Sequence, residues 1–331
     1  MAMSSHEVVR RAIAFERPDR LPLDFQAFGL TDLHAVGWNQ IGTGDNRMQQ
    51  TLDEWGCTWV RPADMTNMGQ VKGHPLADWG ALDHYCWPDP DSPALYDGME
   101  GRFAGSEGKF VTTGIFMLLF ERIHALRGFE NTLADLYLER ERIEMLADRI
   151  VEFDLAIIEN IGRRFPGRIH GFGFSDDWGT EQALFINPAL WDAFFKPRYR
   201  RIFDAAHCQG WSVIMHSCGR VNAIIESLIE IGLDVINLQQ PRVLGIEDIG
   251  RQFRGRICFL SLCDIQHTLP FGGEAEIREE AQLLLQHWAT SDGGFILGDY
   301  GDPAAVGVVE QKKRWMLDAF LAADPWRMDV C

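Results

Sequence analysis

Short apolar segments alternate with longer amphipathic segments along most of the chain. Continuous apolar runs, typical of parallel strands covered on both faces, occur at residues 21–25, 58–62, 110–114, 169–174, 212–216, 234–238, 257–261 and 294–298. Between them, apolar residues at three-and-four spacing predict helices, among them 143–163, 188–208, 223–231, 277–290 and 306–323.

Eight such strands alternating with helices predict a (β/α)8 TIM barrel, with residues 1–331 forming a single domain. The alternative is a doubly wound open sheet, but no Gly-x-Gly-x-x-Gly follows an early strand. Residues 67–108 have little periodicity and contain Trp79 and Trp87. Because long irregular segments in compact domains usually cover something, we expect an N-terminal excursion over one end of the barrel.

Polar residues follow the later predicted strands. They include Asp176, Asp177 and Trp178 after the fourth, His216 and Cys218 at the end of the fifth, Gln240 after the sixth, Cys263 after the seventh, and Asp299 and Tyr300 after the eighth. Catalytic groups of TIM barrels lie at the carboxyl ends of the strands. We therefore expect these side chains to meet at one end of the barrel.

The charge balance narrows the function classes. The chain has 48 acidic against 31 basic residues, for a net charge of −17, which disfavours binding to nucleic acid or to an anionic membrane surface. No apolar run approaches the ~20 residues that cross a bilayer, and residues 1–10 do not resemble a signal peptide. Seven scattered cysteines suit reduced thiols. We expect a cytoplasmic protein with no nucleic-acid or membrane partner.

The pair His216 and Cys218 is the strongest local chemical signal. An imidazole and a thiolate two residues apart at a strand end can share a zinc ion if one or two further ligands are present. The candidates are Cys263, Asp299 and, more weakly, Gln239 or Gln240, and the residue types do not choose among them. The plain alternative is that His-x-Cys arises by chance and that the cysteine only packs.

The adjacent carboxylates Asp176 and Asp177 are the second signal. Such a pair can raise each other's proton affinity, or one of them can hold a partner residue; the alternative is a solvated turn. Trp178 beside them suggests a loop that faces a pocket. Tyr300 could donate a hydrogen bond to a leaving oxygen or merely line the mouth of the barrel.

Several segments together resemble a known family. They are Arg-Ala-Ile-Ala-Phe-Glu-Arg-Pro-Asp-Arg-Leu-Pro at 11–22, Asp-Glu-Trp-Gly at 53–56, Met-His-Ser-Cys-Gly at 215–219, Gly-Leu-Asp-Val-Ile-Asn at 232–237 and Gly-Gly-Phe-Ile-Leu at 293–297. The chain resembles the uroporphyrinogen decarboxylase superfamily, in its corrinoid-dependent methyltransferase branch. The resemblance covers almost the whole chain and implies a TIM barrel. It also implies a homodimer, although no interface can be read from the sequence.

The two branches of this family differ in the segment at 21–29. True decarboxylases carry an arginine-rich sequence there that grips the carboxylates of porphyrinogen, whereas this chain has Leu-Pro-Leu-Asp-Phe-Gln-Ala-Phe-Gly. Because unpaired carboxylates are costly to bury, the absence of arginine argues against porphyrinogen. A metal-independent decarboxylase remains the alternative to a methyltransferase, and a barrel that binds without chemistry is a third reading.

In the methyltransferase branch, zinc is held by His-x-Cys after strand five and by a cysteine after strand eight. His216 and Cys218 match the first part, but Asp299 and Tyr300 stand where the last cysteine is expected. Either Asp299 replaces it, or Cys263 supplies the sulfur, or the site binds no metal.

The resemblance thus implies a zinc-dependent methyltransferase that moves a methyl group between a small substrate (a methyl ether, amine or thiol) and a corrinoid carried by a separate protein. Asp177 or Tyr300 would protonate the departing oxygen of an ether substrate. Asp24, Asp176, Trp178 and Gln240 are the expected substrate contacts.

Overall fold

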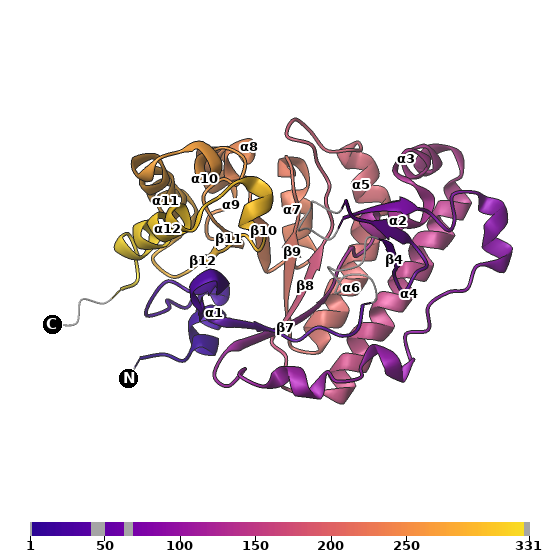
Figure 1. Ribbon diagram of the computed structural model, residues 1–331, viewed down its shortest axis with the longest axis horizontal. Helices are drawn as coiled ribbons and strands as arrows, with labels where there is room; N and C mark the ends of the chain where they lie inside the picture. Colours follow the sequence, from indigo (N-terminus) through magenta and orange to yellow (C-terminus); the bar gives the residue numbers. More distant parts are fainter. Residues whose placement is uncertain (1, 41–49, 63–68, 328–331) are drawn as a thin grey trace.

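The computed structural model describes residues 2–40, 50–62 and 69–327. Eight parallel strands form the wall of a barrel that is nearly closed (Figure 1). In their order around the barrel they are β1 (Leu23–Phe25), β3 (Leu33–Ala35), β7 (Phe110–Ile115), β8 (Gly171–Ser175), β9 (Ser212–His216), β10 (Val235–Leu238), β11 (Cys258–Ser261) and β12 (Phe295–Gly298). The predicted TIM barrel is confirmed.

The prediction that residues 58–62 form the second strand of the barrel is wrong. Residues 58–62 supply β5 (Thr58–Val60), which pairs antiparallel with β4 (Gln50–Leu52) and β6 (Gln70–Gly73) in a separate sheet. The barrel instead uses the short β3, which pairs with β7 in parallel. A two-residue strand, β2 (Leu30–Thr31), pairs antiparallel with β1 at the open edge.

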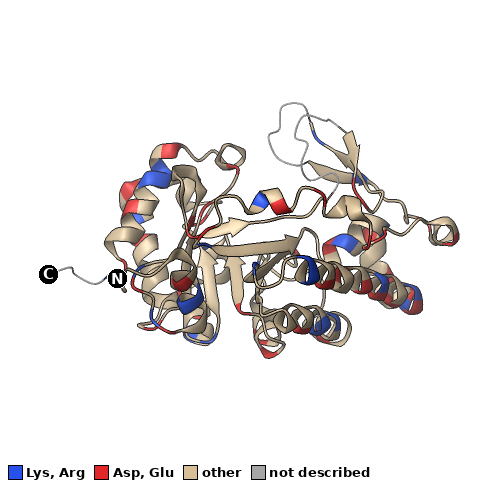
Figure 2. Cartoon of the chain, turned by 90° about the horizontal axis from the view of Figure 1, so that it is seen from below, with Lys and Arg blue, Asp and Glu red and all other residues tan. Residues whose placement is uncertain are grey.

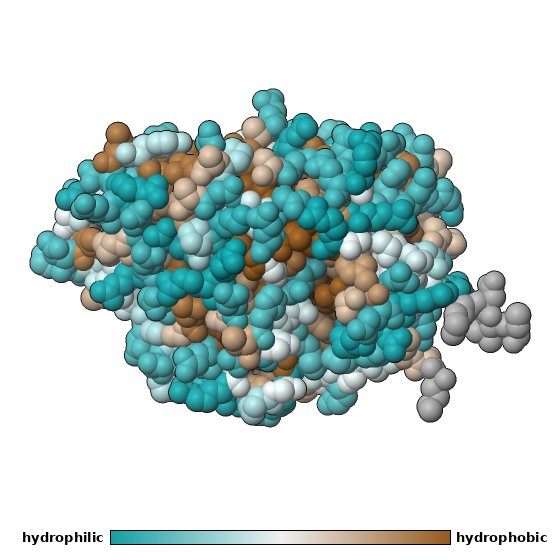
Figure 3. Space-filling model, turned by 180° about the vertical axis from the view of Figure 1, so that it is seen from behind, coloured by the Kyte–Doolittle hydropathy of each residue, from teal (hydrophilic) through white to brown (hydrophobic). Residues whose placement is uncertain are grey.

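Helices cover the outside of the barrel. The described helices are α1 (Ser5–Ala14), α2 (Phe120–Arg127), α3 (Phe129–Leu138), α4 (Arg140–Arg164), α5 (Pro188–Phe194), α6 (Lys196–Cys208), α7 (Asn222–Glu230), α8 (Pro241–Leu244), α9 (Ile246–Phe253), α10 (Thr268–Phe271), α11 (Glu274–Trp288) and α12 (Glu310–Ala322). None of them is long and apolar enough to cross a membrane. Their charged residues lie along their outer sides (Figure 2), and hydrophobic side chains are scattered between hydrophilic ones on the face shown in Figure 3.

Local sequence explains where helices begin and end. Asn187 caps α5, because its side chain accepts a hydrogen bond from the Ala189 N–H at 2.8 Å, and Pro188 follows at the first helical position. The predicted helix 188–208 is divided in two, with Pro197 in the first turn of α6. Gly232 follows α7 with φ +98°, a conformation that favours glycine.

The irregular segment before β7, which was expected to cover one end of the barrel, reaches both ends. Its small sheet lies against α2, where Arg122 forms an ion pair of 2.6 Å with Asp53. The following stretch then runs along α4: Asn160 donates to the Pro90 carbonyl at 3.1 Å, and Phe103 packs against Phe165 just beyond the end of that helix. Residues 79–109 therefore connect the carboxyl end of the barrel to its amino end.

Side chains of the barrel strands alternate between two environments. Val213 and Met215 of β9 belong to the large core between sheet and helices, whereas Ile214 packs in a smaller core inside the barrel. Val9 of α1 joins this inner core from the amino end. His216, two residues after Ile214, therefore also points inward, at the carboxyl end.

Candidate metal and substrate site

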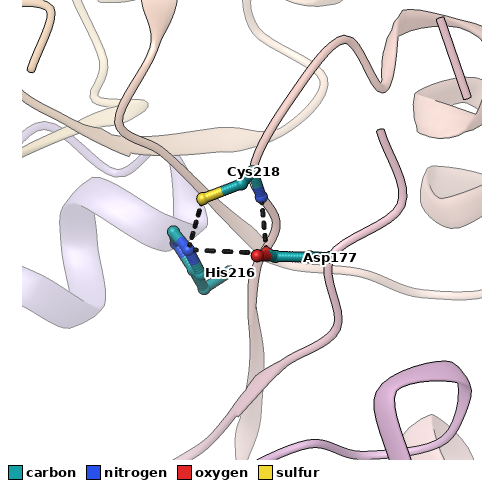
Figure 4. Close-up of side chains that lie close together, drawn as sticks. All are labelled: Asp177, His216 and Cys218. Atoms are coloured by element: carbon teal, nitrogen blue, oxygen red, sulfur yellow. Dashed lines mark hydrogen bonds and ion pairs between the residues drawn. The ribbon is translucent and has the colours of Figure 1, made fainter. Parts of the chain in front are cut away.

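Three potential ligand atoms converge at the carboxyl ends of β8 and β9. Ser175 and His216 are paired in the parallel register of these strands, so the residues that follow them are brought together. The His216 Nε2 atom lies 3.4 Å from Cys218 Sγ and 3.8 Å from Asp177 Oδ1 (Figure 4). All three ligand atoms lie within 4.8 Å of one another. The three residues are partly exposed, so the cluster is open to a ligand.

Neighbouring groups fix the orientation of this cluster. Asn237 stands beside His216 in the register of β10 and β9, with its Oδ1 atom 2.8 Å from His216 Nδ1. Since an amide oxygen only accepts, Nδ1 carries the proton and Nε2 offers its lone pair to the cluster. Asp177 Oδ1 accepts the backbone N–H of Cys218 at 2.7 Å. Burial and the neighbouring Asp177 charge raise the pKa of the Cys218 thiol.

Two predicted substrate contacts instead support the protein itself. Asp176 is fully buried and accepts the backbone N–H groups of the first residues of α2, including those of Phe120 at 2.8 Å and Glu121 at 2.6 Å. Burial raises its pKa to about 6. Trp178 is also fully buried and stacks on Phe120, with ring centroids 4.3 Å apart. Neither side chain lines the cavities described below, and the pair anchors α2 to the site; a direct contact of either residue with substrate stays a prediction.

The remaining predicted residues separate into two groups. Cys263 lies outside the cluster: it is fully buried, with its Sγ atom 3.5 Å from the Ile277 carbonyl of α11, which argues against the role of zinc ligand. Asp299 also lies outside the described cluster and forms a 2.6 Å ion pair with Lys313. Gln240 accepts the Gly219 N–H at 2.7 Å and so holds the loop after β9. Tyr300 lies near Cys218, and burial together with that neighbour raises its pKa.

Glu121 is a site residue that the sequence analysis missed. Its Oε2 atom accepts the Ser175 hydroxyl at 2.7 Å, and the Asp177 backbone also hydrogen-bonds to its carboxyl group. Burial, Asp177 and Asp176 raise its pKa well above the ordinary value. Glu121 follows β7 by a few residues, so the expectation of polar groups after each strand could have found it.

A cavity of about 300 Å³ lies inside the barrel at this end. Polar groups on its wall come from Asp24, Thr112, His216, Asn237 and Gln239, and apolar side chains from Leu33, Ile214 and Leu260. Gly173 contributes no side chain to the wall, and a Cβ atom there would meet only the Thr113 carbonyl, at 3.8 Å. The wall contains no lysine or arginine among the described residues. A larger pocket, of about 760 Å³, lies among α8–α11 and includes none of the three clustered residues.

The family follows from the sequence. Residues 111–299 match the model of the uroporphyrinogen decarboxylase (URO-D) family, which is more than half of the chain. The chain belongs to the uroporphyrinogen decarboxylase family. No curated protein sequence matches it.

The structure of this uroporphyrinogen decarboxylase family member was also compared with solved structures. A methyltransferase from Methanosarcina mazei superimposes with a TM-score of 0.65 and 12% identity, over 96% of this chain and 98% of that one. Dispersin B superimposes with a TM-score of 0.36 and 10% identity, over 71% of this chain and 76% of that one. Xylanase 10B from Thermotoga maritima superimposes with a TM-score of 0.40 and 10% identity, over 89% of this chain and 86% of that one. Only the first of these three similarities is close enough to describe the same fold.

Proposed function

We propose that this protein is a zinc-dependent methyltransferase, which moves a methyl group between a small substrate and a corrinoid carried by a separate protein. The observation that supports it best is the convergence of Asp177, His216 and Cys218 at the mouth of the barrel. The family, and the fold shared with the Methanosarcina mazei methyltransferase, agree with this proposal.

The residues present fit a catalytic zinc ion. Imidazole nitrogen, thiolate sulfur and carboxylate oxygen are the three ligand types that zinc accepts, and catalytic sites combine three protein ligands with one open position. The bond from Asn237 to the far nitrogen of His216 is the kind of support that such ligands usually have. When bound, zinc would act as a Lewis acid on an ether oxygen or an acceptor thiol.

The chain's own groups would divide the remaining work. From the sequence, Asp177 or Tyr300 is the expected proton donor. If Asp177 binds the zinc ion, Tyr300 is the donor; its phenol is half-buried near Cys218. Tyr300 would donate a hydrogen bond to the oxygen that loses the methyl group. The cavity beneath the cluster would hold the rest of the substrate away from water.

The decarboxylase alternative fits the cavity poorly. Uroporphyrinogen carries many carboxylates, and each needs a cationic or hydrogen-bonding partner when buried. The described cavity wall offers no lysine or arginine and already carries the acidic Asp24. Its volume of about 300 Å³ also suits a small molecule.

Zinc content by elemental analysis tests the proposal. We expect one zinc per chain in the wild type and loss of zinc in His216→Ala, Cys218→Ala and Asp177→Ala. Cys263→Ala is the matched control, because it removes a thiol that lies outside the cluster, and it should retain the metal. A wild type that stays metal-free after purification with added zinc would refute the proposal.

A second assay addresses the corrinoid. The zinc-loaded enzyme is mixed with free cob(I)alamin and a set of methyl ethers, methylamines and thioethers, and the loss of the cobalt(I) absorbance is followed. Methylation that requires His216 supports the proposed reaction. Conversion of uroporphyrinogen without corrinoid or zinc would establish the decarboxylase instead.

A further inference from the structure

Asp24 faces His216 across the cavity. Leu23 and Phe25 pack in the core outside the barrel, so strand alternation turns Asp24 inward, where it lines the cavity together with His216. In the order of the eight parallel strands, β1 is four positions from β9 in either direction. The carboxyl group of Asp24 and the imidazole of His216 therefore lie on opposite sides of the same cavity.

Two basic residues in this part of the fold are already paired with other carboxylates. Arg20 donates two hydrogen bonds to Asp32, at 2.6 Å and 2.5 Å, and Lys313 lies 2.6 Å from Asp299. Asp24 itself accepts the Thr31 hydroxyl at 3.1 Å and also bonds to the Gln26 side chain. Lys313 lines a neighbouring pocket together with Asp24, but among the described residues no ion pair joins the two.

This arrangement leaves the partly buried carboxyl group of Asp24 without an ion-pair partner among the described residues. A carboxylate that is partly withdrawn from water and unpaired is costly, and it either takes up a proton or acquires a cation. Burial, together with Asp299 and Asp32, raises the pKa of Asp24. No group of three metal-ligating side chains forms around it in the described residues, and Leu33, Ile214 and Leu260 make much of the wall apolar. Such a wall, apolar apart from one carboxyl group and a few neutral polar groups, suits an alkylated organic cation better than a hydrated metal ion.

We infer that the substrate carries an alkylammonium group that binds Asp24, while its reacting group lies across the cavity at His216, Cys218 and Asp177. The identity of the reacting end rests on the proposed methyltransferase function. The inference of a cationic group rests only on the residues that line the cavity, so the two parts of the inference can be tested separately.

Calorimetry with two nearly isosteric probes tests the inference. Choline carries a trimethylammonium group, and 3,3-dimethylbutan-1-ol replaces that nitrogen by carbon, so the pair differs chiefly in charge. We expect the wild type to bind choline at least tenfold more tightly than the alcohol. Asp24→Asn should abolish this preference and Asp24→Glu should retain part of it. Asp148→Asn, which changes a carboxylate paired with Arg198 outside the barrel, should keep it.

Two further variants separate the explanations. Gly173→Val fills the cavity without touching Asp24 and should weaken the binding of both probes. His216→Ala removes a proposed metal ligand but should keep the preference for choline, so loss of zinc does not imitate loss of the ammonium site. Circular dichroism confirms that each variant is folded.

Three results would overturn the inference. They are the absence of choline binding at millimolar concentration, equal affinity for the two probes, and a choline affinity that Asp24→Asn leaves unchanged. A preference for the neutral alcohol would indicate that Asp24 is protonated and donates a hydrogen bond.

Discussion

Removal of the Asn237 side chain should weaken zinc binding without removing a ligand. The Asn237 amide oxygen accepts the Nδ1 proton of His216 at 2.8 Å and is the ring's partner on the side away from the cluster. Without it, the imidazole gains rotational freedom and can move its proton to Nε2, which would block coordination. Loss of such a supporting hydrogen bond typically lowers metal affinity by about 10- to 100-fold, or roughly 1.4–2.8 kcal/mol. We expect a loss in this range for Asn237→Ala.

Competition with a chromophoric zinc chelator measures this effect directly. Asn237→Asp keeps an acceptor oxygen at the same position, so its affinity should stay near that of the wild type. Asn160→Ala is the matched control: it deletes a buried amide on α4 that bonds the Pro90 carbonyl, and it should lower stability while leaving zinc affinity unchanged. If Asn237→Ala binds zinc as tightly as the wild type, the orienting role assigned to Asn237 is wrong.

Three other predictions concern stability and the proton donor. Burial raises the pKa of Glu54 from its ordinary value of 4.5 to about 7. Between these pH values the folded state holds a proton that the unfolded state has lost, so the free energy of unfolding falls as pH rises. Glu54→Gln should flatten this pH dependence, measured by urea titration at several pH values. Trp178→Ala should cost about 3–5 kcal/mol, measured by urea unfolding; a loss below 1 kcal/mol would contradict its buried position. Tyr300→Phe should slow demethylation of an ether at least tenfold without reducing zinc content, and equal rates would remove Tyr300 from the mechanism.

The barrel could be predicted from the sequence because most of its strands are long apolar runs. The exception is informative. Residues 58–62 have the composition of a strand, but their partners are β4 and β6, and no local pattern reveals a pairing partner. The true barrel strand β3 is only Leu-His-Ala, too short to show any period.

The candidate site was predictable to the extent that it is local in sequence. His216 and Cys218 lie at one strand end, and Asp177 follows the neighbouring strand, so parallel pairing brings them together. Cys263 shows the limit, because the residue type suits zinc but the side chain packs against α11. Glu121 depends on the contact between α2 and Asp176, which joins residues far apart in the chain.

The glycine lining of the barrel separates selectivity from chemistry. A Cβ atom at Gly114 would collide with the Gly173 carbonyl oxygen at 1.9 Å, so this position is fixed by the approach of β7 to β8. Gly173 itself has open space before it and bears no proposed ligand. A larger residue there would shrink the cavity and leave Asp177, His216 and Cys218 in place. Evolution or design could thus change which molecules this barrel accepts through a single strand position while its reactive centre is inherited intact.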